Sequence, residues 1–296
     1  MTANPIFRGA ASALITPTNA NGVDYEALGK LIDWQIDEGI DALVIAGTTG
    51  EGSTLTDAEH RELLEYSVKR INGRVPMIAG TGSNDTAYAV ELSKFACEIG
   101  ADGLLCVTPY YNKTTQRGLI AMYTAIADAS TKPVIVYNVP SRTGVNVEPA
   151  TFAKLAEHPN IAAIKEASGN ISQIAEVAAL VGDKADIYSG NDDQIVPIMA
   201  LGGQGVISVL SNIMPKATHD MCAKWFAGQT DEALKMQLDL LPLCKALFCE
   251  TNPIPVKAGM AAMGWCENYL RLPLVTMEEG HAEKLFGLMR EQGLLK

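Results

Sequence analysis

Residues 134–170 read VIVYNVPSRTGVNVEPATFAKLAEHPNIAAIKEASGN, and the predicted fold rests on the pattern of this stretch. It begins with a short apolar run at 134–138 and passes through a segment in which Pro149 suits the first turn of a helix. It then returns to a second apolar run at 162–165. Short runs that are apolar throughout are typical of strands buried on both faces, as in a parallel sheet. The stretch therefore predicts one strand–helix–strand unit.

The same alternation extends in both directions along the chain. Short apolar runs bounded by Gly, Pro, Ser or Thr predict eight strands, at 11–16, 42–46, 77–80, 103–107, 134–138, 162–165, 186–189 and 206–209. Between them, Thr56 and Glu59 form a capping-box pattern, and residues 84–86 and Pro215 suit further helix starts. Eight such units close a (β/α)8 TIM barrel, which we expect over residues 1–227. The alternative is an open doubly wound sheet, which more often carries a Gly-rich phosphate turn after its first strand.

Residues 228–296 are mostly helical by pattern, and we expect them to form a C-terminal helical domain packed on the barrel. No linker or low-complexity stretch separates them from the barrel, so this appendage is not expected to be independent. Apolar residues share one helix face in two segments: Leu234, Leu238 and Leu241, and Leu285, Leu288 and Met289.

The composition excludes several classes of protein. A chain of 296 residues that is 48% hydrophobic can bury a large core, which excludes disorder. The net charge of -11 argues against binding to nucleic acid or to an anionic membrane surface. No apolar run approaches the length of a membrane span, and the N-terminus lacks signal-peptide features, so a cytoplasmic protein is expected. The six cysteines form no CxxC pair and the four histidines are widely separated, so we expect reduced thiols and no metal site.

In a barrel of this kind, the carboxyl ends of the strands build the active site. Lys165 stands at such an end, after the apolar residues 161–164. Position alone leaves two interpretations open: an ion-paired or snorkelling lysine, or a functional amine that faces the barrel mouth. Burial lowers the pKa of a lysine and frees a neutral amine, which can form a Schiff base with a ketone. Glu166 is not favoured as its partner, because adjacent strand residues point to opposite faces.

Hydroxyl groups gather at the same predicted edge, on Thr48, Thr49, Tyr110, Tyr111 and Tyr137. Each alone is more often a core or rim residue, but together they can supply proton transfer around one lysine. The turn at 47–51 (GTTGE) offers backbone amides that can hold a small carboxylate. Arg142 could bind a second carboxylate with the N–H donors of its guanidinium group.

Five motifs together resemble the dihydrodipicolinate synthase family, over about residues 6–295. They are GTTGE at 47–51, TPYYNK at 108–113, YNVPSRTG at 137–144, IKEASGN at 164–170 and NPIPVK at 252–257. Motifs of the GTTGE and IKE types are shared by the wider class of pyruvate-dependent lyases and aldolases. SRTG together with Tyr111 and Tyr137 is more specific to the synthases.

The resemblance implies catalytic roles for four residues. Lys165 matches the lysine that forms the imine with pyruvate, and Tyr137 matches the proton donor and acceptor. Thr48 and Tyr111 match the rest of the proton relay, and in the family this second tyrosine enters from a neighbouring subunit.

The resemblance also implies substrate contacts. Thr49 and Ile207 match positions that contact pyruvate, Arg142 matches the arginine that receives the carboxylate of L-aspartate 4-semialdehyde, and Gly190 lines the same pocket. The implied reaction condenses pyruvate with this semialdehyde to 4-hydroxy-tetrahydrodipicolinate, in lysine and diaminopimelate biosynthesis. It requires no metal or organic cofactor. Family members are usually homotetramers, built as dimers of dimers, and in some cases they are dimers.

Two other functions compete with this interpretation. An N-acetylneuraminate lyase or a keto-sugar-acid aldolase would share Lys165 and Tyr137, but such enzymes generally do not place arginine at position 142. A non-catalytic binding module on the same barrel would be expected to lose the lysine or a tyrosine, and this chain keeps both.

Many family members are inhibited by lysine in a cleft that matches Gly52–His60, Asn84–Tyr88 and Tyr110. This chain carries Tyr88 where strongly inhibited members tend to carry glutamate, and Asp57 where some carry histidine. A bound ammonium needs a carboxylate or several other acceptors. We therefore expect weak or absent inhibition by lysine.

Overall fold

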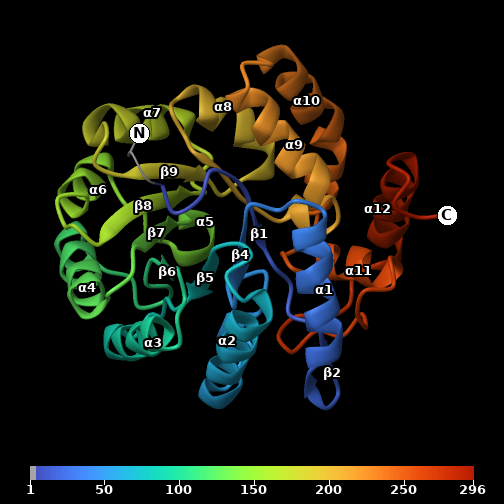
Figure 1. Ribbon diagram of the computed structural model, residues 1–296, viewed down its shortest axis with the longest axis horizontal. Coiled ribbons are helices and arrows are strands. Elements are labelled where there is room, and N and C mark those ends of the chain that lie inside the picture. Colours follow the sequence, from blue (N-terminus) through green and yellow to red (C-terminus); the bar gives the residue numbers. More distant parts are fainter. Residues whose placement is uncertain (1–4) are drawn as a thin grey trace.

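Eight parallel strands close into a barrel in the computed structural model, which describes residues 5–296 (Figure 1). The barrel strands, in chain order, are β1 (Gly9–Ala13), β4 (Ala42–Ile45), β5 (Met77–Gly80), β6 (Gly103–Val107), β7 (Val134–Asn138), β8 (Ile161–Glu166), β9 (Asp186–Ser189) and β10 (Gly205–Ser208). The barrel closes where β1 pairs with β10, with Gly9 opposite Gly205. The TIM barrel is therefore confirmed and the open sheet is excluded. Residues 1–4, which the predicted barrel included, lie outside the described residues.

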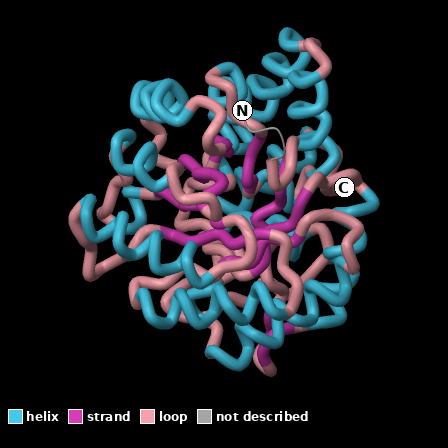
Figure 2. The backbone as a smooth tube through the Cα atoms, turned by 60° about the vertical axis from the view of Figure 1, so that its left-hand side comes forward, coloured by secondary structure: helices cyan, strands magenta, loops and turns pink. Residues whose placement is uncertain are grey.

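The helices alternate with these strands and surround them (Figure 2). The barrel helices are α1 (Tyr25–Asp37), α2 (Asp57–Ile71), α3 (Thr86–Glu98), α4 (Gln116–Ala129), α6 (Pro149–Leu155), α7 (Ile171–Val181), α8 (Ile195–Ala200) and α9 (Pro215–Phe226). The shorter elements are a hairpin of β2 (Thr18–Asn19) and β3 (Gly22–Val23), the one-turn helix α5 (Pro140–Thr143), and the 3-10 turns η1 (Gly52–Thr54), η2 (Asp192–Gln194) and η3 (Leu210–Asn212).

The predicted helix starts are observed. Thr56 and Glu59 form a complete capping box at α2, Asp85 caps α3, and Pro149 and Pro215 are the first residues of α6 and α9. These caps satisfy first-turn amides that have no partner within the helix.

The first strand differs most from its predicted range of 11–16, because it ends at Ala13. Beyond it, the Ile15 amide donates to Asn212 Oδ1 at 2.9 Å, and the Thr16 hydroxyl donates to the Gly50 carbonyl at 2.7 Å. The chain at 15–16 therefore bonds to the loops at the barrel mouth instead of continuing the ladder.

Apolar side chains form two layers of core. The inner layer fills the barrel and includes Ala11, Val44, Ile78, Ile135 and Ile207. The outer layer packs the strands against the helices, as the short apolar strands require.

Three further helices follow the barrel: α10 (Thr230–Ala246), α11 (Ile254–Ala262) and α12 (Glu279–Glu291). α10 packs on α9 and α8, and α12 packs on α10 and α11 (Figure 1). Over residues 5–296, no helix has the length and apolarity needed to cross a membrane.

The stripe of leucines on α10 is not its buried face. Leu234 and Leu238 are exposed, whereas Ala233, Gln237 and Leu240 are buried. Gln237 explains this orientation: its Oε1 accepts from the Val196 amide at 3.1 Å, and its Nε2 donates to the Asp192 carbonyl at 2.8 Å. Hydrogen bonds of a polar residue thus help to set the face that the helix presents to the barrel.

Candidate active site

Lys165 lies near the end of β8 and points into the barrel mouth. It pairs in register with Tyr137 on β7, and its Nζ lies 4.3 Å from the centroid of the Tyr137 ring. The lysine is 5% exposed, and no ion pair among the described residues involves it. Of the two interpretations of this lysine, the geometry favours the functional amine.

Glu166 points to the other side of the strand, as strand alternation requires. Its carboxylate accepts from Asn138 Nδ2 at 3.1 and 3.2 Å and from the Ser168 amide at 2.9 Å. Burial raises the pKa of Glu166, and these hydrogen bonds oppose the rise. Its role is to tie β7 to β8 behind the site.

Burial lowers the pKa of Lys165 to about 7. The negative charge of Asp192 opposes this shift, and the positive charge of Arg142 adds to it. Asp192 is itself buried: its Oδ2 accepts from the amides of Val209 and Leu210 at 3.0 and 2.9 Å, and its Oδ1 has no hydrogen-bond partner. A lysine with this pKa is about half neutral near pH 7, so a nucleophilic amine is available.

Tyr137 supplies a phenol directly beside that amine. Burial raises the pKa of Tyr137, whereas the charge of Arg142 and a hydrogen bond with Thr48 lower it. The phenol therefore stays protonated near neutral pH and can donate a proton to a group bound at Lys165.

The turn at 47–51 follows β4 and carries Thr48 and Thr49. Its own backbone hydrogen bonds run from the Glu51 amide to the Thr48 carbonyl and from the Gly52 amide to the Gly47 carbonyl. The amides of Thr48 and Thr49 take no part in these bonds. A Cβ on Gly52 would lie 2.2 Å from the Ala46 carbonyl oxygen, so the turn closes this tightly only with glycine there.

A cavity of about 620 Å³ brings most of the predicted site residues together. Its lining includes Thr48, Thr49, Tyr137, Arg142, Lys165 and Gly190. A Cβ on Gly190 would lie 2.7 Å from the Ala167 Cβ and 3.1 Å from the Lys165 Cε, so glycine keeps room for the lysine side chain.

Two predicted site residues lie outside this lining. Ile207 is fully buried inside the barrel, and Val209, two residues further along, lines the cavity instead. Tyr111 is 91% exposed and its backbone is left-handed, with φ of 70°. A single chain thus presents Tyr111 to its surroundings and not to its own lysine.

The structure adds residues that the sequence did not assign to the site. Asn252 lies just before α11, and its Nδ2 donates to Thr49 Oγ1 at 2.9 Å. Its carbonyl accepts from Arg142 Nη2 at 3.0 Å. The sequence offered one signal, the motif at 252–257, but no indication that this distant segment reaches the barrel mouth.

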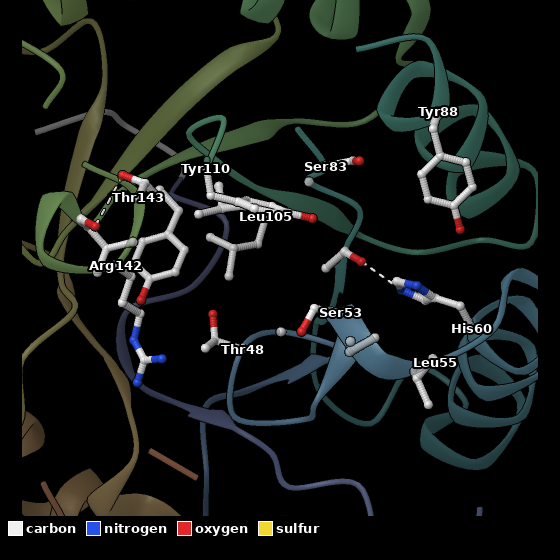
Figure 3. Close-up of a pocket in the computed structure, with 18 residues that line it drawn as sticks. Thr48, Ser53, Leu55, His60, Ser83, Tyr88, Leu105, Tyr110, Arg142 and Thr143 are labelled. Carbon is white, nitrogen blue, oxygen red and sulfur yellow. Dashed lines mark hydrogen bonds between the residues drawn. The ribbon is translucent and has the colours of Figure 1, made fainter. Parts of the chain in front are cut away.

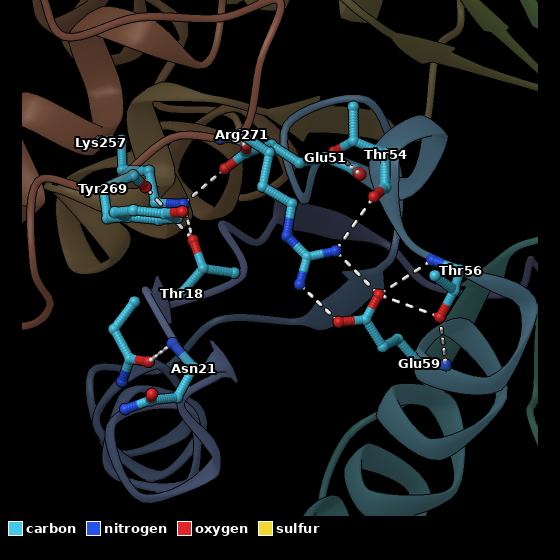
Figure 4. Close-up of polar contacts among 10 residues, drawn as sticks. Thr18, Asn21, Glu51, Thr54, Thr56, Glu59, Lys257, Tyr269 and Arg271 are labelled. Carbon is cyan, nitrogen blue, oxygen red and sulfur yellow. Dashed lines mark hydrogen bonds and ion pairs between the residues drawn. The ribbon is translucent and has the colours of Figure 1, made fainter.

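The same motif also contacts the turn at 47–51 through Lys257. Lys257 is fully buried and pairs with Glu51 at 2.5 Å, and its ammonium also donates to Thr18 Oγ1 at 2.7 Å (Figure 4). Arg271 donates its backbone amide to Glu51 and its guanidinium to Glu59 (Figure 4). The segments after the barrel thus hold the loop after β4 through the buried Glu51 carboxylate.

A second cavity, of about 380 Å³, adjoins the first and shares Thr48, Tyr137 and Arg142 with it (Figure 3). Its far end is lined by His60, Tyr88 and Tyr110, among other residues. His60 is held there by a 2.9 Å contact between its Nε2 and the Gly80 carbonyl (Figure 3).

Among residues 5–296, no cluster of His, Cys, Asp and Glu has the arrangement of a metal site. The six cysteines are unpaired, and five of them are partly or fully buried beside apolar neighbours.

The comparisons with known proteins agree with this geometry. The sequence model of the Dihydrodipicolinate synthetase family matches residues 6–292. A 4-hydroxy-tetrahydrodipicolinate synthase of Thermoanaerobacter sp. (strain X514) is 53% identical, over 99% of this chain and 99% of its own. The crystal structure of dihydrodipicolinate synthase from Aquifex aeolicus is 45% identical with a TM-score of 0.96, over 97% of this chain and 99% of its own. A structure described as the first monomeric dihydrodipicolinate synthase variant is 42% identical with a TM-score of 0.96, over 98% of both chains.

Proposed function

Because the chain belongs to the dihydrodipicolinate synthetase family, we propose that Lys165 is the nucleophile with which it performs the family's reaction. That reaction is the condensation of pyruvate with L-aspartate 4-semialdehyde to 4-hydroxy-tetrahydrodipicolinate, a lyase activity of lysine and diaminopimelate biosynthesis. One observation carries the proposal: the buried amine of Lys165, with a pKa near 7, shares a cavity with Tyr137 and Arg142.

The first half of the reaction takes place at pyruvate. The neutral amine of Lys165 attacks the keto carbon, and loss of water, aided by a proton from Tyr137, leaves an iminium ion. Thr49 and the amides of the turn at 47–51 hold the pyruvate carboxylate. The deprotonated Tyr137 then takes a proton from the methyl group, which gives an enamine because the iminium accepts the electron pair.

The second half joins the two substrates. Arg142 holds the carboxylate of the semialdehyde with charge-assisted hydrogen bonds, which places the aldehyde near the enamine. The enamine carbon attacks the aldehyde, and Thr48 and Tyr137 supply the proton to the new alkoxide. The amino group of the adduct then attacks the iminium carbon, which closes the ring and releases Lys165.

We propose further that the enzyme needs no metal or organic cofactor, because the imine itself supplies the electron sink. The exposed Tyr111 supports a dimer in which each subunit completes the site of the other, with two dimers forming a homotetramer. We propose a cytoplasmic location, in keeping with six unpaired cysteines.

Reductive trapping tests the nucleophile. Borohydride treatment in the presence of pyruvate is expected to leave a stable adduct on the peptide that contains Lys165, and Lys165→Ala is expected to abolish it. An assay with L-aspartate 4-semialdehyde completes the test. An adduct at wild-type yield in the folded variant would show that another residue is the nucleophile.

A further inference from the structure

Asn252 contacts both groups that we assign to substrate carboxylates. Its Nδ2 donates to Thr49 Oγ1 at 2.9 Å, and its backbone carbonyl accepts from Arg142 Nη2 at 3.0 Å. The residue lines the active-site cavity and is 5% exposed, yet its Oδ1 has no hydrogen-bond partner. Buried polar atoms almost always have partners, so an unpaired acceptor at a substrate cavity points to a donor that arrives with the substrate.

The direction of the hydrogen bonds identifies the kind of group that is missing. Since Asn252 Nδ2 donates to Thr49 Oγ1, the proton of the Thr49 hydroxyl remains available to a carboxylate. Asn252 Oδ1 can only accept, so it requires an N–H or O–H donor. The semialdehyde brings such a donor, its α-ammonium group, which the assignments above leave without a protein partner.

The position of Arg142 places that ammonium group near Asn252. In the semialdehyde the carboxylate and the ammonium are attached to the same carbon. A carboxylate bound to Arg142 therefore brings the ammonium to within a few ångströms of the residue to which the guanidinium is itself bonded.

The part of the cavity wall that contains Asn252 also carries a negative charge, which is complementary to an ammonium. Glu250 is the one acidic residue among the described residues that line this cavity, whose cations are Lys165 and Arg142. Its Oε1 accepts from the Glu278 amide at 3.0 Å and lies 2.8 Å from His281 Nδ1, so the carboxylate is held in place at the start of α12.

We propose that Asn252 determines specificity for an amino-acid aldehyde: its Oδ1 accepts a hydrogen bond from the α-ammonium, and Glu250 supplies the opposite charge on the same wall. This inference rests on the proposed function and deepens it. An aldehyde that has the carboxylate but lacks the amine is held by Arg142 alone.

Succinic semialdehyde is the probe, because it is the substrate with hydrogen in place of the amine. The KM for L-aspartate 4-semialdehyde and the inhibition constant of succinic semialdehyde are measured for each variant. We expect Asn252→Ala to raise the KM about ten- to a hundredfold, since one hydrogen bond to a charged group is lost, and to change the inhibition constant far less. Glu250→Gln is expected to act in the same direction with a smaller effect. The matched control is Glu278→Gln, which removes a carboxylate 3.9 Å from the same His281 but outside the cavity lining, and which should change neither constant.

Two further variants separate recognition from positioning. Thr49→Val removes the acceptor of the hydrogen bond from Asn252 Nδ2. It should raise the KM for pyruvate and leave unchanged the ratio between the KM for L-aspartate 4-semialdehyde and the inhibition constant of succinic semialdehyde. Asn252→Asp keeps an acceptor and adds a charge, so it should retain the preference for the amine even if Asn252→Ala does not fold.

Equal weakening of both semialdehydes by Asn252→Asp or Asn252→Ala would overturn the inference, because the Asn252 side chain would then contribute only to the shape of the carboxylate-binding wall and not to recognition of the amine. A wild-type enzyme that forms the pyruvate adduct but gives no product with L-aspartate 4-semialdehyde would instead overturn the proposed function.

Discussion

At the scale of single residues, the pKa of Lys165 makes imine formation depend on pH. Only the neutral amine attacks pyruvate, and burial lowers the pKa of Lys165 to about 7. The initial rate of trapping with pyruvate and cyanoborohydride is therefore expected to rise with pH through about 7 and then level off. A midpoint near the ordinary lysine value of 10.5 would contradict the burial argument.

Asp192 provides a check on the same electrostatics. Its negative charge raises the pKa of Lys165, so Asp192→Asn should move the midpoint of the trapping profile to lower pH. Asp193→Asn is the matched control, because that neighbouring carboxylate is exposed and should leave the midpoint in place.

The proposed role of Arg142 is to bind the carboxylate of the second substrate. Arg142→Ala is expected to spare the pyruvate adduct and to raise the KM for L-aspartate 4-semialdehyde. Loss of a charge-assisted hydrogen bond costs about 1.5–3 kcal/mol, which corresponds to about a ten- to hundredfold change. Steady-state kinetics with each substrate varied in turn measures both effects. Loss of pyruvate trapping, or unchanged kinetics for the semialdehyde, would contradict this role.

At the scale of elements, the pair of Glu51 and Lys257 joins the loop after β4 to helix α11 within the protein interior. Lys257→Met would leave a buried carboxylate without its partner, which is expected to cost about 3–5 kcal/mol of the free energy of unfolding. The double variant Glu51→Gln with Lys257→Met removes both charges and should recover much of that loss. Urea denaturation of the two single variants and the double variant gives the coupling between the residues.

The partly exposed pair of Arg271 and Glu59 serves as the comparison. Arg271→Met should cost less than Lys257→Met, because Glu59 can be solvated when its partner is removed. Equal losses would mean that the interior position of the first pair does not determine its contribution.

The contact between α2 and α3 bears on inhibition by lysine. Tyr88 donates to Asp57 Oδ1 at 2.9 Å, and Arg61 Nε lies 3.0 and 2.9 Å from the two oxygens of the same carboxylate. Tyr88 lines the second cavity, whereas Asp57 is absent from its lining. Asp57 thus already has partners, and we do not expect it to replace the glutamate of strongly inhibited members.

We therefore expect inhibition by lysine to be weak or absent, with Tyr88→Glu increasing it. Lysine titrated into the millimolar range at saturating pyruvate measures the effect. Strong inhibition of the wild type at sub-millimolar lysine would show that another acceptor in the cavity binds the ammonium.

At the scale of the whole molecule, the sequence predicted the features that repeat along the chain. Strands such as β5 and β7 were located correctly because buried parallel strands are short apolar runs between turn residues. The meeting of Lys165 and Tyr137 was predicted because polar residues at the carboxyl ends of such strands lie at one mouth of the barrel. Asn252 escaped prediction, because its contact with Thr49 joins residues 203 positions apart and depends on how the segment after the barrel folds back.

The apolar pattern also failed to predict which side of α10 packs on the barrel, because that side depends on contacts with distant residues. Leu234 and Leu238 are exposed, whereas the buried face combines Leu240 and Leu243 with Gln237, which bonds to backbone groups of the barrel. The periodicity of apolar residues predicts a helix, but it cannot predict that a glutamine with specific hydrogen-bond partners is buried while a leucine is exposed.

Tyr111 is 91% exposed, so it cannot transfer a proton at the Lys165 of its own subunit. If two subunits exchange Tyr111 across a two-fold interface, each site contains the lysine of one subunit and the tyrosine of the other. In a heterodimer of Tyr111→Phe and Lys165→Ala subunits, one site then has both native residues and the other has neither. Mixing the two inactive variants in equal amounts should restore about a quarter of the wild-type activity per dimer, because half of the dimers are mixed and each has one working site. Native mass spectrometry of differently tagged copies establishes that subunits have exchanged. Mixed dimers as inactive as either parent would place Tyr111 outside the partner's site.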